Sequence, residues 1–320
     1  MATGRAGAAR AGEYSTANRA FRALSCRPVE NPEAPALPPL LPLLAQGLVG
    51  PLRAAAAAGG RFEASLDLGR SRATVEVLPG GAAWRALGQD WPMPGPVDDR
   101  TVLHWDGAAF VPVQRWEGKL YKLVATPFGP PTFEIDGVKM LPSAEGSPWD
   151  DAARKVALVA PRGQRVLDTC GGLGYFAAWC LRRGATAVDS WEQAAAVHWL
   201  RSLNPWSPGS PASLALGDPL AGLRLAHGDI AIAIEALPDA AYGAVLHDPP
   251  RFALAGELYS QRFYDQLARV LRRRGRLFHW TGAPNSRSRG RDLASEVVQR
   301  LRRAGFNAAP SGDGVLAAKE

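Results

Sequence analysis

Short apolar runs alternate with longer helix-like stretches from Trp149 to the end of the chain, and this alternation narrows the possible folds more than any other feature. The expected strands cover residues 165–168, 185–190, 223–226, 244–246, 276–280 and 314–318, and the expected helices cover residues 150–159, 175–183, 193–203, 263–273 and 293–304. Strands that alternate with helices of this length form a parallel sheet with helices on both faces. The sequence therefore predicts an α/β domain over residues 145–320.

The residues before this domain follow a different pattern. From Arg61 to about Met140 apolar and polar residues alternate with a period of two, as in residues 62–68 and 73–77. Asp106-Gly107 and Asp136-Gly137 lie between such runs, and Asp-Gly is a strong signal for a hairpin turn. The sequence predicts a small antiparallel β domain of four to seven strands over residues 61–144. Since it has no cluster of catalytic residue types, we expect it to serve substrate recognition or dimerisation, and the oligomeric state stays open.

Residues 1–60 are of low complexity. Residues 1–30 hold five arginines against two glutamates, with much alanine. This composition fits either an organellar transit peptide or a disordered tail. The stretch that follows is rich in proline and leucine and is typical of a linker with one short helix. The expected location is therefore the cytoplasm, or the stroma or matrix of an organelle if the first residues are a targeting peptide.

Composition excludes several classes of protein. The chain has 320 residues, 47% of them apolar, which is enough for a large core without covalent cross-links. Three cysteines without CxxC spacing and five scattered histidines argue against a disulfide scaffold and a structural zinc site, so no metal is expected. The best candidate for a membrane span, residues 34–52, is interrupted by five prolines, so no span is expected.

A glycine-rich turn connects the expected strand 165–168 to the helix that follows it. The strand ends at Asp168, and Gly171, Gly172 and Gly174 come next. Glycines let the backbone approach a ligand closely, and in doubly wound sheets such turns lie at the carboxyl ends of strands, where ligands bind. The spacing alone also fits, weakly, a nicotinamide-binding turn. The acid directly before the glycines favours a cationic ligand instead.

These residues resemble the first motif of the class I S-adenosylmethionine (SAM)-dependent methyltransferases. The resemblance implies a Rossmann-like domain with a mostly parallel seven-stranded sheet and SAM as the cofactor. It also implies an acid on the ribose hydroxyls after the second strand, because a carboxylate can accept both hydrogen bonds. Glu192 is our choice for that acid and Asp189 the alternative, while Asp229 is expected to meet the adenine amino group. The remaining implied cofactor contacts are Asp168, Gly171, Gly172, Gly174 and Asp248.

The fourth expected strand ends in the run His247-Asp248-Pro249-Pro250-Arg251-Phe252. This run resembles the Asp/Asn-Pro-Pro-aromatic motif of methyltransferases that act on planar nitrogens, in which the acid accepts a hydrogen bond from the target and the prolines fix the backbone. The resemblance implies that Asp248 contacts or deprotonates the acceptor. His247 and Tyr259 are secondary catalytic candidates, or else ordinary core residues. Pro249, Pro250 and Arg251 are the implied acceptor contacts, and because Arg251 replaces the aromatic residue the methylated atom stays open.

A closer resemblance spans residues of about 120–306. The runs 136–140, 203–207, 247–260 and 287–292 look like a group of predicted archaeal methyltransferases, which is similar to spermidine synthases in overall plan. Residues 256–264 are also similar to a segment of aminopropyltransferases, so aminopropyl transfer is the alternative activity. We expect His247 and Arg251 beside Asp248 to repel a polyamine, which favours methyl transfer.

Ten arginines and only two acids lie between Arg272 and Arg303. Six of them are expected on helices or turns, where they form a solvated basic face. Arg287, Arg289 and Arg291 instead follow the fifth expected strand, on the side of the cofactor, and a guanidinium pairs well with phosphate or carboxylate groups. The sequence therefore predicts an anionic acceptor, RNA or an acidic metabolite. A nucleic-acid-binding protein without catalysis is the non-enzymatic alternative.

Overall fold

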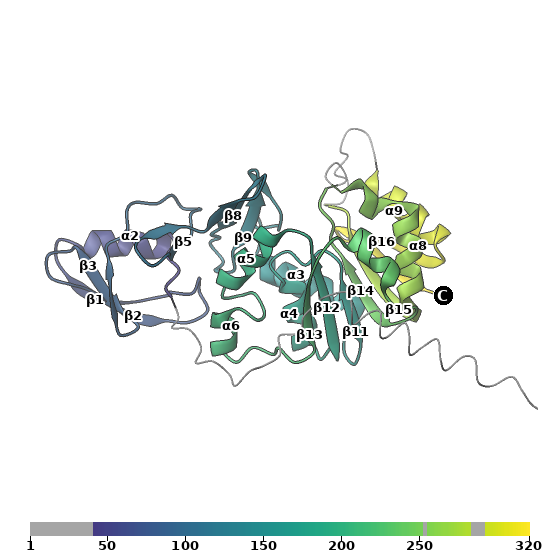
Figure 1. The fold of residues 1–320 in the computed structure, drawn as a ribbon, viewed down its shortest axis with the longest axis horizontal. Coiled ribbons are helices and arrows are strands. Elements are labelled where there is room, and N and C mark those ends of the chain that lie inside the picture. The colour runs from purple at the N-terminus through teal and green to yellow at the C-terminus, as the bar shows by residue number, and fades with distance from the viewer. Residues whose placement is uncertain (1–40, 252–254, 283–291) are drawn as a thin grey trace, which may run out of the picture.

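The computed structural model describes residues 41–251, 255–282 and 292–320, and a seven-stranded sheet organises its C-terminal part (Figure 1). The strands of this sheet are β11 (Arg165–Asp168), β12 (Ala187–Glu192), β13 (Leu223–His227), β14 (Tyr242–His247), β15 (Leu271–Trp280), β16 (Phe306–Ser311) and β17 (Gly314–Lys319). They lie in the order β13-β12-β11-β14-β15-β17-β16. β17 pairs antiparallel with both of its neighbours, β15 and β16, and all other pairs of the sheet are parallel. The mostly parallel, Rossmann-like sheet expected from the sequence is thus confirmed.

Helices cover both faces of this sheet, as expected. The helices are α3 (Pro148–Val159), α4 (Tyr175–Arg182), α5 (Ala195–Leu203), α6 (Pro211–Ala215), α7 (Ile230–Ala233), α8 (Gln261–Val270) and α9 (Leu293–Arg303), with 3-10 turns at Ile234–Ala236 and Gly256–Tyr259. One core lies between the sheet and α8 and α9, and the other lies between the sheet and α3, α4 and α5. Side-chain caps define several starts: Ser147 precedes α3, Ser260 precedes α8 and Asp292 precedes α9.

The N-terminal part consists of ten short strands and a helix. These elements are α2 (Gln46–Ala55), β1 (Gly60–Ala64), β2 (Ala73–Val77), β3 (Ala83–Ala86), β4 (Gln89–Pro92), β5 (Leu103–Trp105), β6 (Phe110–Pro112), β7 (Gln114–Trp116), β8 (Leu120–Val124), β9 (Thr132–Ile135) and β10 (Val138–Lys139). They form the sheets β1-β2-β3-β4 and β10-β9-β8-β7 and the hairpin β5-β6, all antiparallel.

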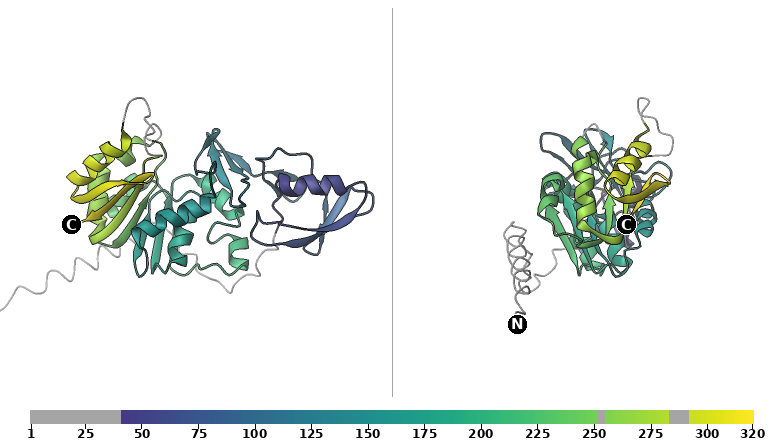
Figure 2. Two further views of the ribbon diagram at one scale, coloured as in Figure 1. Left: turned by 180° about the vertical axis from the view of Figure 1, so that it is seen from behind. Right: turned by 90° about the vertical axis from the view of Figure 1, so that its right-hand side faces the viewer.

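The two four-stranded sheets belong to different cores. The sheet β1–β4 and helix α2 pack around Trp84 and Trp91 in a core of their own. The sheet β7–β10 instead contributes Leu123 and Phe133 to the core that contains α3 and α4. Seen from behind in Figure 2, β7–β10 lies between the N-terminal sheet and the Rossmann-like domain. The single β domain expected over residues 61–144 is therefore divided between two packing units.

Three further expectations need correction. Residues 41–60 were expected to be part of a linker with one short helix; the helix is present as α2, but its residues Leu48, Val49 and Leu52 are buried, so this stretch belongs to the folded part. Residues 272–274 were expected on a helix or turn but lie in β15, which begins directly after α8 because Leu271 is extended and pairs with Tyr242. The strand β16, which pairs with β17, was not expected from the sequence.

Two of the sequence predictions concern residues outside the described ranges. The possible targeting segment 1–30 is one, and the arginines at positions 287, 289 and 291 are the other. Within the ranges described, no helix combines the length and the apolar character that crossing a bilayer requires. The same residues contain no group of three or more side chains arranged to hold a metal ion.

Candidate functional site

A cavity lies where the carboxyl ends of β11, β12, β14 and β15 meet. From the strand ends, its lining comprises Cys170, Gly171, Gly172, Leu173, Glu192, Asp248, Pro249, Pro250, Arg251 and Trp280. Helices α3, α4 and α5 add Pro148, Asp151, Ala152, Tyr175, Phe176 and Val197. The segment around β9 and β10 closes one side with Phe133, Ile135, Val138, Lys139, Met140 and Leu141. The N-terminal strands thus form a wall of this cavity, a role that period-two alternation alone does not reveal.

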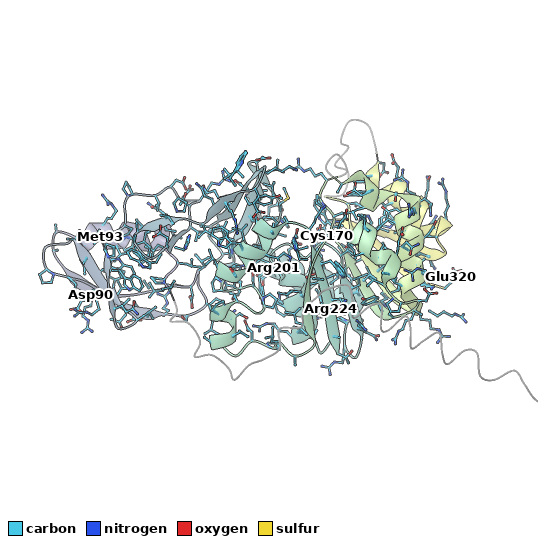
Figure 3. All side chains as sticks on the ribbon, in the orientation of Figure 1. Asp90, Met93, Cys170, Arg201, Arg224 and Glu320 are labelled. Carbon is cyan, nitrogen blue, oxygen red and sulfur yellow. The ribbon has the colours of Figure 1, made fainter. Side chains whose placement is uncertain are left out.

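The glycine turn between β11 and α4 forms the floor of the cavity (Cys170 marks its start in Figure 3). A Cβ atom on Gly171 would lie 2.3 Å from the side chains of both Ser190 and Arg201. Gly174 has φ +82°, and its Cβ would lie 2.9 Å from Pro208. Gly172 has φ +48° and faces the cavity, where a Cβ would come within 4 Å only of the Phe133 ring. Gly171 and Gly174 are therefore needed for packing, whereas Gly172 leaves space for a ligand.

Asp168 and Arg201 support this turn from below. The Asp168 carboxylate is buried and accepts a hydrogen bond from Ser190 Oγ (2.7 Å), and burial raises its pKa to about 6. Arg201, labelled in Figure 3, donates from Nε to the Gly172 carbonyl (2.6 Å) and from Nη2 to Ser190 Oγ (3.0 Å). Asp168 is not among the residues that line the cavity, so it supports the turn and lies behind its surface.

Arg201 was not among the expected site residues, although the sequence contains a signal for it. On α5 it lies on the same buried side as Val197 and Leu200. A charged residue on the apolar face of an expected helix needs a buried partner, because an unpaired buried charge is costly. Here Ser190 and the carbonyl of the glycine turn accept its hydrogen bonds, and the carboxylates of Asp168 and Glu192 supply the opposite charge.

Glu192 and Asp189, the two candidates for the ribose contact, have different surroundings. Glu192 lines the cavity and accepts hydrogen bonds from the backbone N–H groups of Gly172 (3.0 Å) and Ala194 (3.0 Å), and burial raises its pKa. Asp189 is buried within β12 and binds Arg165, Arg224 and the Tyr242 hydroxyl. The structure brings Glu192 to the cavity and leaves Asp189 in a structural ion-pair cluster.

We expect substitutions of these two acids to separate ligand binding from stability. Glu192→Ala should weaken SAM binding by roughly 1–3 kcal/mol, because the ribose hydroxyls lose their acceptor. Asp189→Asn should leave SAM affinity unchanged but lower the thermal midpoint, because the partly exposed Arg165 and Arg224 lose their counter-charge. Calorimetric titration and thermal unfolding of both variants check this, and a loss of SAM affinity in Asp189→Asn would show that the strand end was assigned wrongly.

Asp229 does not reach the cavity. Its carboxylate accepts a hydrogen bond from the Ala231 N–H (2.8 Å) and caps α7. It is absent from the residues that line the cavity. The structure therefore gives this acid the role of a helix cap, and a contact to adenine from this position stays a prediction.

Asp248 and the two prolines that follow it form the side of the cavity opposite β12, the strand that ends in Glu192. Asp248, Pro249 and Pro250 line it, and Arg251 lies exposed at its rim. The pKa of Asp248 is raised to about 6 mainly by burial, while Lys155 acts in the opposite direction. Within the described part of the chain, the geometry shows no hydrogen bond that occupies this carboxylate. Asp248 is therefore placed where an acceptor can meet it.

His247 and Tyr259, unlike Asp248, do not line the cavity. The buried His247 ring makes hydrogen bonds to Thr169 Oγ1 (2.7 Å) and to the Leu258 carbonyl (3.0 Å), and burial lowers its pKa well below the usual value. The Tyr259 hydroxyl donates to the Pro250 carbonyl (3.1 Å). Neither side chain is among those that line the cavity, so both lie behind the strand end.

Comparison with known proteins supports the fold. No protein-family model matches the chain. An uncharacterized protein of Methanocaldococcus jannaschii is 43% identical over 187 residues, which is 58% of this chain and 61%, less than two thirds, of that protein. A spermidine synthase in complex with the transition-state analogue AdoDATO matches with a TM-score of 0.51 and 14% identity, over 65% of this chain and 73% of the synthase. M. jannaschii TYW2 in complex with AdoMet matches with a TM-score of 0.39 and 13% identity, over 72% of this chain and 89% of TYW2.

Proposed function

From a Rossmann-like fold shared with spermidine synthases and SAM-dependent methyltransferases, we propose that this chain binds SAM and transfers its methyl group to an acceptor held at Asp248. One observation carries the proposal. The glycine turn after β11, Glu192 at the end of β12 and Asp248 after β14 line a single cavity. Neighbouring parallel strands present their carboxyl ends at one edge, which is where ligands of such sheets bind.

The residues of the cavity fit SAM in shape and charge. Gly172 leaves its backbone accessible, and each Glu192 oxygen retains a lone pair beside the backbone bond it accepts. The carboxylates of Glu192 and Asp248 at the strand ends suit a sulfonium ion, although Lys139 and Arg251 also line the cavity and Asp151 is already paired with Lys155. When bound, SAM supplies an activated methyl group. The chain's own residues then need to hold the acceptor about 3 Å from it and in line with the leaving sulfur.

Asp248 is the residue we assign to orienting the acceptor. Its carboxylate is ionised above a pH of about 6 and can then accept a hydrogen bond or a proton from the nucleophile. The rings of Phe133, Phe176 and Trp280 line the same cavity and keep water away from the transfer. No covalent bond between enzyme and substrate is required.

The proposed function is tested by two measurements on the full chain. Calorimetric titration with SAM and with its demethylated product should show binding of both. Incubation with methyl-labelled SAM and a cell extract, followed by fractionation into RNA, protein and small molecules, should transfer label to one fraction. Failure of SAM to bind would overturn the proposal, and binding without transfer of label to any fraction would favour the non-enzymatic alternative.

Aminopropyl transfer is a second candidate, favoured by one observation. Asp151 and Asp248 both line the cavity, and two carboxylates suit an amine substrate. The repulsion expected from His247 does not apply, because this ring is buried in the core with a lowered pKa. Aminopropyl transfer requires decarboxylated SAM as the donor. Tighter binding of decarboxylated SAM than of SAM would favour this candidate over methyl transfer.

We further propose, from the arginine-rich segment alone, that the acceptor is anionic. Replacing Arg287, Arg289 and Arg291 together with glutamine should raise the acceptor's Michaelis constant strongly while SAM affinity barely moves, because each charge-assisted pair contributes roughly 1.5–3 kcal/mol. If the acceptor is RNA, its affinity should fall steeply with salt, and the triple variant should show a shallower slope. A salt-insensitive acceptor would contradict the RNA assignment.

A further inference from the structure

Lys155 is a lysine without exposed surface, which is rare in folded proteins. It lies on α3, and its ammonium forms ion pairs with Asp151 Oδ2 (2.7 Å) and Asp313 Oδ2 (3.5 Å). The Nζ atom is also 5.4 Å from the centre of the Trp280 ring and 5.9 Å from that of Phe176. Asp151, Phe176 and Trp280 all line the cavity. The lysine therefore connects three parts of the cavity wall from behind.

We propose that Lys155 is a positioning residue for the transfer reaction, which holds Asp151, Phe176 and Trp280 in place and supplies positive charge behind the wall of the cavity that Asp248 also lines. This inference rests on the proposed function for its meaning in catalysis. Two aromatic faces and two carboxylates are a strong environment for a buried ammonium. The three wall residues come from α3, α4 and β15, so one side chain fixes elements that are distant in the sequence.

The positive and negative side chains around Lys155 balance before Asp248 is counted. Arg154 binds the same two aspartates, with distances of 2.6 Å to Asp151 and 3.0 Å to Asp313. Two cations thus face two carboxylates, and Asp248 adds a further negative charge within range of Lys155. Since Arg154 has half its side chain exposed, solvent screens its charge, whereas that of Lys155 acts through the protein interior.

Other titratable groups also interact with Asp248. They are Asp151, Asp313, Asp168, Cys170 and Tyr259. Two of these groups, Asp151 and Asp313, oppose ionisation of Asp248. Lys155, which lies between them, favours it. Removal of the lysine charge should therefore make Asp248 harder to ionise.

The test is Lys155→Met, and the readout is the titration of Asp248 itself. Methionine has a similar length and packs well against aromatic rings, and both aspartates keep Arg154 as a partner, so this variant should fold. The carboxyl NMR signals of isotopically labelled aspartate are followed against pH in the full chain, with Asp248→Asn identifying the signal of Asp248. We expect the Asp248 midpoint to rise by about one unit in Lys155→Met, because a nearby opposite charge is lost.

Two further variants make the result decisive. Lys155→Arg retains the charge and should keep the midpoint near that of the wild type. Arg154→Met removes a charge that solvent screens from the same aspartates, so it should also leave the Asp248 midpoint unchanged. An unchanged midpoint in Lys155→Met, or an equal rise in Arg154→Met, would overturn the assignment. Neither titration requires SAM or an acceptor, so these outcomes are independent of whether the proposed function holds.

Activity then separates positioning from mere support of the fold. With the acceptor fraction found by methyl labelling, Lys155→Met should reduce turnover by about 10- to 100-fold and move the acidic limb of the rate–pH profile upward, while SAM affinity stays within about twofold. Equal losses in SAM affinity and turnover would mean that Lys155 only stabilises the fold, and would overturn the proposal.

Discussion

Gly172→Val should abolish SAM binding while the protein stays folded. Gly172 lines the cavity, and a branched side chain at this position would occupy the space that faces the Phe133 ring. The valine must also adopt φ near +48°, which costs about 1–2 kcal/mol in a residue with a Cβ. We expect the dissociation constant for SAM to rise by more than about 100-fold, equivalent to about 2.8 kcal/mol. Calorimetric titration measures this loss, and circular dichroism checks the fold.

Gly163→Val is the matched control for this variant. Gly163 also has positive φ (+69°), no atom lies within 4 Å of its Cβ position, and it precedes the amino end of β11, far from the glycine turn. The control should therefore lose a similar amount of stability but bind SAM as the wild type does. If Gly172→Val bound SAM with unchanged affinity, the glycine turn would not be the cofactor site.

Asp248→Asn should remove most of the transfer activity but leave SAM binding intact. The amide keeps the shape of the side chain but cannot take a proton, and loss of a general base reduces turnover by about 100- to 10,000-fold. The folded-state pKa of Asp248 is raised to about 6, above the ordinary value of 3.8, so the ionised form prevails only above that pH. At a saturating concentration of SAM, the turnover of the wild type should therefore rise as the pH passes through about 6 and level off above it.

The same raised pKa makes a prediction about stability, which serves as an internal check. A carboxyl that binds its proton more tightly in the folded state contributes stability at low pH, and this contribution is lost as the pH rises through about 6. Asp248→Asn should therefore be at least as stable as the wild type at pH 8. Asp150→Asn, which alters an exposed carboxylate on α3, should leave turnover unchanged. Full activity in Asp248→Asn would exclude this residue from the chemistry.

The sequence predicts the elements that line the floor of the cavity because their signals are local. An apolar run, an acid and a glycine turn define β11 to the residue, and the carboxyl-end rule then places Glu192 and Asp248 at one edge. Arg272, Arg273 and Arg274 show where local signals fail. Their stretch continues a helix-like pattern, but the chain extends at Leu271 because pairing with Tyr242 outweighs helix propensity.

The walls of the cavity were not predictable, because they depend on contacts between distant segments. The alternation of apolar and polar residues shows that β9 has two faces. It does not show that Phe133 lies over Gly172, which follows almost forty residues later in the sequence. The Tyr175 hydroxyl fixes this arrangement by donating to the Pro131 carbonyl (2.8 Å). Lys155 and Arg201 were missed for a different reason, since a charged residue on an expected helix is normally assigned to the solvent side, although the position of Arg201 on the buried face of α5 is a signal against that.

The wall formed by β9 and β10 has a consequence for how specificity can change in chains of this kind. The floor that we assign to SAM comes from the Rossmann-like sheet, whereas Ile135, Val138 and Met140 of the wall lie in or directly after the strands of the separate antiparallel sheet β7–β10. Exchanges among apolar side chains on this sheet leave the glycine turn and the hydrogen bonds of Arg201 beneath it intact. We therefore expect a few substitutions in this sheet to change the choice of acceptor while SAM binding stays the same.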